Sequence, residues 1–203
     1  MNKKLAAALS GGSVLLMTLS GCSDDSGNKV NDWAKKVCDQ VQPQLTKIAG
    51  ANTSIQQATS DSSKPADVQK TDAAAFQSIS DAYKALGAAV NAAGAPPVDD
   101  GEKTQKEAVS ELNATSKAYA DLKADVDDLD IKDQAKFADG LKGVADELDK
   151  LSTSGDEALQ KLQSGDVGAA MAKQPGCQRP ETSAPAGSGS DTASKEPSAD
   201  TSS

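Results

Sequence analysis

Residues 76–93, FQSISDAYKALGAAVNAA, carry the pattern that decides the fold. The large apolar side chains in this stretch recur with a strict 3-4-3-4-3 spacing, at Phe76, Ile79, Tyr83, Leu86, Val90 and Ala93. Because an α-helix turns once in 3.6 residues, this spacing places all of them on one helical face. Gly94-Ala95-Pro96-Pro97 follows directly and predicts the end of the helix. The stretch therefore predicts an amphipathic helix.

A similar face precedes this helix. Its apolar positions are spaced by threes and fours, at Val30, Trp33, Val37, Val41, Leu45 and Ile48. Pro43 interrupts this face, and because proline lacks an amide hydrogen and disfavours helix before it, we expect a kink or a helix that restarts. The run Ser60-Asp61-Ser62-Ser63-Lys64-Pro65 predicts a turn, with Pro65 at the first position of the next helix.

Two more faces follow residue 93. The third comprises Val109, Leu112, Ser116, Tyr119, Leu122, Val126 and Leu129, and the fourth comprises Phe137, Leu141, Val144, Leu148 and Leu151. We expect Asp99 to cap the third helix, with Glu102 completing a capping box, and Asp130 or Asp133 to cap the fourth. The fourth helix is expected to bend at 152–155 and to resume to Leu162, and a short helical turn is expected at 166–173.

Four such helices of about 25–30 residues, joined by short loops, predict an all-α fold, an up-down-up-down four-helix bundle over residues 30–177 with a short fifth helical turn. The segment 178–203 is rich in Ser, Thr, Pro and Ala and has no large apolar residue. Such a segment buries too little surface to offset the entropy of ordering, so we expect a disordered C-terminal tail.

The first 29 residues predict a membrane anchor. Lys3 and Lys4 precede an apolar run from Leu5 to Leu19, which is shorter than the ~20 residues of a membrane-spanning helix. The run ends in Leu19-Ser20-Gly21-Cys22, which resembles the lipobox of bacterial lipoproteins. This resemblance implies a signal peptide at 1–21, cleavage before Cys22, a lipid on its sulfur and attachment to the extracytoplasmic face of the cell membrane. The alternative is an ordinary secretory signal followed by chance by a cysteine. Residues 22–29 are polar and are expected to form a flexible tether.

The two remaining cysteines, Cys38 and Cys177, form an even pair in an exported chain and predict a disulfide, with two free thiols as the alternative. In a bundle with an even number of antiparallel helices, the start of the first helix and the end of the last lie at the same pole. The positions of Cys38 and Cys177 therefore favour four helices over three.

Charge and composition exclude several functions. The full chain has a net charge of −9, and loss of Lys3 and Lys4 with the signal takes it to −11. Nucleic-acid-binding proteins carry clustered positive charge, so we expect no nucleic-acid partner. The chain has no histidine, which is the usual general base near neutral pH and the commonest metal ligand. We therefore expect no enzymatic activity and no cofactor.

The sequence contains two candidate sites. The acidic run Asp125, Asp127, Asp128, Asp130 and Asp133 raises the possibility of calcium, but an EF-hand loop needs glycine at its sixth position, where Asp130 stands. A solvated helix end is favoured, so no metal is expected. A ligand pocket within the bundle is the second candidate, with its lining drawn from Trp33, Tyr83, Tyr119 and Met171. At helical spacing, such residues are more often plain core.

The lipobox, the Ala- and Lys-rich helices, the paired cysteines and the Ser/Thr/Pro tail together resemble the small secreted lipoproteins of actinobacteria. The resemblance implies an exported lipoprotein and supplies no catalytic residues. It favours a non-enzymatic interaction or structural module of the cell envelope, held to the membrane through Cys22 and bound to an unknown envelope protein. The alternative function is a small-molecule carrier with its ligand inside the bundle.

Overall fold

The computed structural model describes residues 23–58, 63–154 and 157–178, and within these ranges all regular secondary structure is helical. Four long helices come first in the chain: α1 (Ser23–Ala58), α2 (Pro65–Ala93), α3 (Gly101–Asp127) and α4 (Gln134–Ser154). Three short elements follow them: α5 (Glu157–Leu162), α6 (Gly165–Ala172) and the 3₁₀ turn η1 (Pro175–Cys177). The all-α prediction is confirmed.

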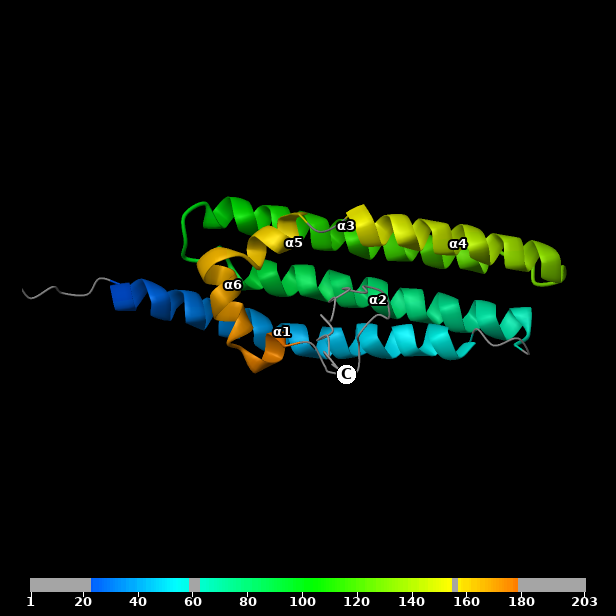
Figure 1. The fold of residues 1–203 in the computed structure, drawn as a ribbon, viewed down its shortest axis with the longest axis horizontal. Helices are drawn as coiled ribbons and strands as arrows, with labels where there is room; N and C mark the ends of the chain where they lie inside the picture. The colour runs from blue at the N-terminus through cyan, green and yellow to red at the C-terminus, as the bar shows by residue number, and fades with distance from the viewer. Residues whose placement is uncertain (1–22, 59–62, 155–156, 179–203) are drawn as a thin grey trace, which may run out of the picture.

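The long helices run in alternating directions, from α1 at the bottom of Figure 1 to α4 at the top. The fourth helix ends at Ser154 and helix α5 runs from Glu157 to Leu162, which agrees with the predicted bend at 152–155 and resumption to Leu162. The chain then turns back through α6 and η1 to α1. At one end of the molecule α4 completes the bundle, and at the other end α5 and α6 do so. The short helical turn predicted at 166–173 is confirmed as α6.

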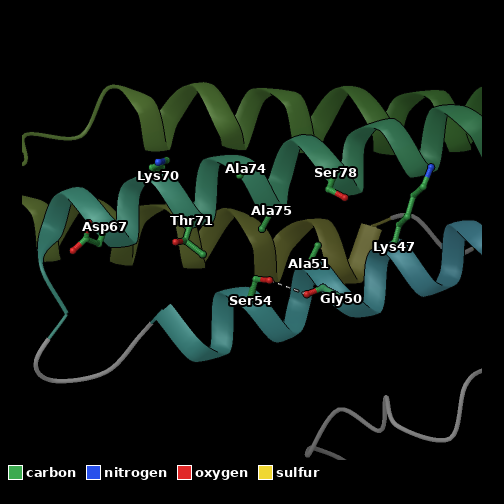
Figure 2. Close-up of a pocket in the computed structure, with 10 residues that line it drawn as sticks. All are labelled: Lys47, Gly50, Ala51, Ser54, Asp67, Lys70, Thr71, Ala74, Ala75 and Ser78. Atoms are coloured by element: carbon green, nitrogen blue, oxygen red, sulfur yellow. Dashed lines mark hydrogen bonds between the residues drawn. The ribbon is translucent and has the colours of Figure 1, made fainter.

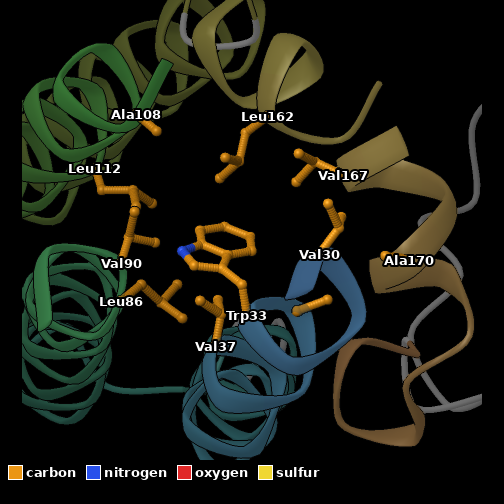
Figure 3. Packing of buried hydrophobic residues seen from close by; sticks show 11 residues of the cluster. Val30, Trp33, Val37, Leu86, Val90, Ala108, Leu112, Leu162, Val167 and Ala170 are labelled. Atoms are coloured by element: carbon orange, nitrogen blue, oxygen red, sulfur yellow. The ribbon is translucent and has the colours of Figure 1, made fainter. Parts of the chain in front are cut away.

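Because α4 completes one end of the bundle and α5 and α6 complete the other, the bundle contains two hydrophobic clusters. The first, which we call the Trp33 cluster, surrounds the chain's only tryptophan with residues from α1, α2, α3, α5 and α6, as Figure 3 shows. The second, the Phe76 cluster, joins α1, α2, α3 and α4 around Phe76, Ile79 and Val126. Alanine is frequent in both clusters, and it allows helix axes to approach closely.

Helix α1 departs from two sequence expectations. It continues unbroken through Pro43, because Pro43 lies on the exposed side while Val37 before it and Ala51 after it are buried against the bundle. It also begins at Ser23, so residues 23–29 are helical rather than an irregular tether. A helix extends only ~1.5 Å per residue, which shortens the reach of this segment by more than half relative to an extended chain.

Side chains from neighbouring helices satisfy the carbonyls at the end of α2. Trp33 Nε1 donates to Gly94 O at 2.8 Å, and Lys36 Nζ donates to Ala92 O at 3.0 Å. Gly94 ends the helix with φ of 80°, a conformation that glycine adopts without steric cost, as the sequence predicted. These bonds hold Trp33 and Lys36, which lie well after the start of α1, at the level of the α2–α3 connection.

The predicted capping box at the start of α3 is wrong. Asp100, not Asp99, precedes the helix, with φ of 57° and no hydrogen bond from its side chain to the helix. The cause lies in Gly101, where a Cβ atom would overlap the Pro96 carbonyl oxygen. The tight packing of the Pro-Pro connection therefore sets this helix start. For α4, by contrast, Asp133 Oδ1 accepts from the amides of Ala135 and Lys136 at 3.1 and 3.2 Å, which confirms the cap.

Cys38 and Cys177 form the predicted disulfide, with Cα atoms 4.9 Å apart. The expected return of the chain to the end of the bundle where α1 starts is confirmed, because residues of α5 and α6 pack with Val30 and Trp33. Cys38, however, lies well inside α1 rather than at its start. The bridge forms because α6 and η1 return to the side of α1. Gly176 lies against the Cys38 carbonyl, where a Cβ atom would overlap the oxygen. Glycine is thus required next to Cys177 for the two backbones to meet.

Candidate surface groove

A groove of about 740 Å³ follows the line where α1 and α2 meet on the outside of the molecule. Figure 2 shows its lining side chains on both helices, with α4 behind them. They are mostly small or hydroxyl-bearing: Lys47, Gly50, Ala51 and Ser54 from α1, and Asp67, Lys70, Thr71, Ala74, Ala75 and Ser78 from α2. Ala51 and Ala75 are buried members of the Phe76 cluster, so they form the floor of the groove.

The chemistry of the groove suits contact rather than catalysis. Its charged groups are two lysines and one aspartate of opposite sign, Lys47, Lys70 and Asp67. The hydroxyl of Ser54 already donates to the carbonyl of Gly50 at 3.0 Å, within its own helix. A surface lined by glycine, alanine and serine lets a second backbone approach closely, as small residues do where helices pack. The groove therefore provides a surface of small side chains for close contact, together with a few charged side chains.

The four residues considered for an internal ligand pocket are instead divided between the packed clusters. Trp33 is buried in the Trp33 cluster, and Met171 packs against that cluster. Tyr83 and Tyr119 stack with ring centroids 5.6 Å apart, and Phe76 approaches Tyr119 at 6.2 Å. Burial, together with the neighbouring Tyr83, raises the pKa of Tyr119 to about 12, so its hydroxyl stays neutral. These side chains are therefore part of the packed interior.

The acidic run at the end of α3 is divided among local roles. Asp133 caps α4, and Asp130 Oδ1 accepts from the Lys132 amide at 3.0 Å in the connection. Asp127 forms an ion pair with Lys123 one turn earlier. Across the described ranges, no three Cys, Asp or Glu side chains are grouped as a metal site would require.

One unusual residue, Asp72, was not among the residues that the sequence pattern singled out. Its side chain is only 4% exposed, and Oδ1 has no hydrogen-bond partner among the residues that the structure describes. Burial raises the pKa of this carboxyl from 3.8 to about 6. The signal was available, since the 3-4 spacing extended backward from Phe76 reaches Asp72 and then buried Val68. An acid thus occupies a core position of α2.

Comparisons with protein-family models, with curated protein sequences and with solved structures found no match to this chain. In the part of the chain that the structure describes, no helix combines the length and the apolar character needed to cross a bilayer. Cys22, the predicted lipid attachment site, the signal peptide at 1–21 and residues 179–203 of the predicted tail lie outside the described residues.

Proposed function

We propose that this protein is a non-enzymatic interaction module of the cell envelope, held at the extracytoplasmic face of the membrane by lipid on Cys22. The proposal for the anchor rests on the Leu19–Cys22 tetrapeptide after a short apolar run. Lipidation anchors a chain stably when two acyl chains enter the bilayer, because each buried CH₂ contributes ~0.8 kcal/mol. The body then needs no membrane-spanning helix of its own.

One observation supports interaction over transport. The hollow between α1 and α2 opens outward, whereas aromatic and aliphatic side chains fill the centre of the bundle around Trp33 and Tyr119. A carrier needs an enclosed space that covers most of its ligand. An open groove with small residues on its floor instead suits a segment of a partner protein laid across two helices. We therefore assign the partner contact to the α1–α2 groove.

Site-specific photocrosslinking in intact cells tests this assignment. A photoreactive residue at Ser54 or at Ser78 reaches into the groove from α1 or from α2. Both variants should yield the same crosslinked partner, and Ala74→Trp, which fills the groove, should abolish that product. Ala145, an exposed alanine on α4, is the matched control position and should give no such product. Equal crosslinking from Ala145 and Ser78 would show that the groove is not the contact.

The anchor is tested separately. Cys22→Ala should abolish incorporation of labelled fatty acid and release the protein into the medium, because the remaining body has no other apolar attachment among its described helices. Retention of the Cys22→Ala protein in the membrane fraction would overturn the lipid anchor without affecting the groove assignment.

A further inference from the structure

We infer that α1 acts as a rigid post that holds the bundle upright, with the α1–α2 groove far above the membrane. This inference rests on the proposed lipid anchor at Cys22 and adds the height at which the partner must lie. It follows from three features of the described residues: the start of α1, the charge distribution on the helix surfaces and the position of the groove.

The first feature is the overhang of α1 beyond the rest of the bundle. Helix α1 begins at Ser23, one residue after the proposed attachment point, and residues 26–29 are exposed. Its first buried residue is Val30. Trp33 donates a hydrogen bond to the carbonyl of Gly94, at the C-terminal end of α2. From Ser23 to Trp33 the helix rises ~15 Å. In Figure 1 this end of α1 projects past the α2–α3 connection.

The second feature is that the described helices present no apolar face that would hold the bundle flat on the bilayer. In the described part of the chain, the only large hydrophobic side chain with substantial exposure is Ile131. Several lysines on the helix surfaces are paired with acids one turn away, as in Lys35–Asp39 at 2.8 Å and Lys117–Asp121 at 2.6 Å. The sides of the bundle thus carry both signs of charge, and the mature chain as a whole is strongly acidic.

Electrostatics then favours the upright orientation on an anionic leaflet. The Debye length at physiological ionic strength is ~8 Å, shorter than the ~15 Å overhang. An upright body keeps the charges that lie beyond Trp33 outside this screening length, whereas a lying body brings one side of a bundle with net negative charge within it. The helical start of α1 removes the slack that a flexible tether would give. The two effects together hold the long axis away from the membrane plane.

The third feature is the position of the groove along α1. Its lining residues on this helix run from Lys47 to Ser54. At 1.5 Å per residue, these lie ~36–46 Å from Ser23 along the helix. The partner segment must therefore reach the groove from outside the bilayer. A segment of a soluble or wall-linked protein meets this requirement, and a membrane-spanning helix or a lipid headgroup does not.

Energy transfer to the bilayer surface tests the orientation. The lipid-modified chain, extracted from membranes, carries a donor dye at Ala95→Cys in the α2–α3 connection or at Ile131→Cys in the α3–α4 connection. Cys38 and Cys177 are bridged and do not react. The protein is placed on phosphatidylglycerol-containing vesicles with acceptor-labelled headgroups. Transfer from the Ala95 position should exceed transfer from the Ile131 position severalfold. Lys132→Cys, exposed in the same connection, guards against a folding defect at Ile131.

A flexible insertion supplies the matched control. Gly-Gly-Ser between Gly27 and Asn28 breaks α1 below the first buried residue and should reduce the difference between the two dye positions. Equal transfer from both positions in the uninterrupted chain would overturn the upright orientation while leaving the anchor intact. Failure of the extracted protein to float with the vesicles would instead refute the lipid anchor, and the orientation with it.

Discussion

At the scale of single residues, the Asp72 side chain opposes the fold at neutral pH. Its carboxyl lies at a core position with one oxygen unpartnered, and burial raises its pKa from 3.8 to about 6. Between these two values the folded chain keeps a proton that the unfolded chain releases. The free energy of unfolding therefore falls as pH rises through this window, by at most about 3 kcal/mol at 1.36 kcal/mol per pKa unit.

Asp72→Asn should remove this pH dependence, because asparagine carries no titrating group. Urea unfolding between pH 4 and pH 8 measures it: wild type should lose stability relative to Asp72→Asn as pH rises from 4 to 7, and above pH 7 the difference should be constant. Asp81→Asn, an exposed aspartate on the same helix, is the matched control and should follow wild type. Parallel curves for wild type and Asp72→Asn would contradict the assignment.

Gly176 makes a second prediction at this scale. Gly176→Ala places a Cβ atom on the Cys38 carbonyl, and the resulting shift of η1 should lower the free energy of unfolding by ~1–3 kcal/mol, as overpacking does. Gly143 lies at an exposed position of α4, where a new Cβ atom would meet nothing within 4 Å. Gly143→Ala should therefore raise the free energy of unfolding by ~0.5–1 kcal/mol through helix propensity. Opposite signs in chemical denaturation are the expected outcome, and a stabilised Gly176→Ala protein would contradict the close approach.

At the scale of elements, α6 and η1 form a strap that the Cys38–Cys177 disulfide holds against α1. Val167 and Ala170 of α6 are buried members of the Trp33 cluster (Figure 3). The bridge closes a loop with a sequence separation of 139. The loop-entropy model assigns ~4–5 kcal/mol to a loop of this length, and native disulfides typically contribute ~2–5 kcal/mol.

Reduction of the disulfide should therefore lower the midpoint of unfolding and expose Trp33. Because Trp33 is the only tryptophan, the tryptophan fluorescence reports the Trp33 cluster, to which α6 contributes, and its emission should shift to the red as thiols appear. The double variant Cys38→Ala/Cys177→Ala should show the shifted emission with or without reductant. An unchanged emission after full release of both thiols would mean that packing alone holds α6 in place.

At the scale of the whole molecule, the sequence predicted the parts of the fold that depend on local periodicity. The 3-4 spacing gave the four long helices, Gly94 and Pro65 bounded α2 as expected, and Asp133 capped α4. The disulfide pairing also followed, since only two cysteines remain after Cys22. Each of these depends on residues close in sequence or on simple counting, so no knowledge of the packing was needed.

The groove and the buried acid were not predicted, for a different reason. Gly50 and Ala74 read as ordinary helix positions, and they become a surface hollow only because α1 and α2 lie side by side there. Asp72 was not predicted because an acid interrupts the apolar pattern of the sequence, although the packing of α2 buries it. Both features depend on which side of each helix faces a neighbour.

The sequence by itself thus determined the helical class, the positions of the long helices and the cysteine pair, because helix periodicity and turn residues act over a few positions. The tertiary structure decided the continuity of α1 through Pro43, the division of the fourth bundle position between α4 and α5–α6, and the meeting of Cys38 with Cys177. These outcomes depend on side chains far apart in the chain, whose burial against one another outweighs the local preference of a proline or a loop.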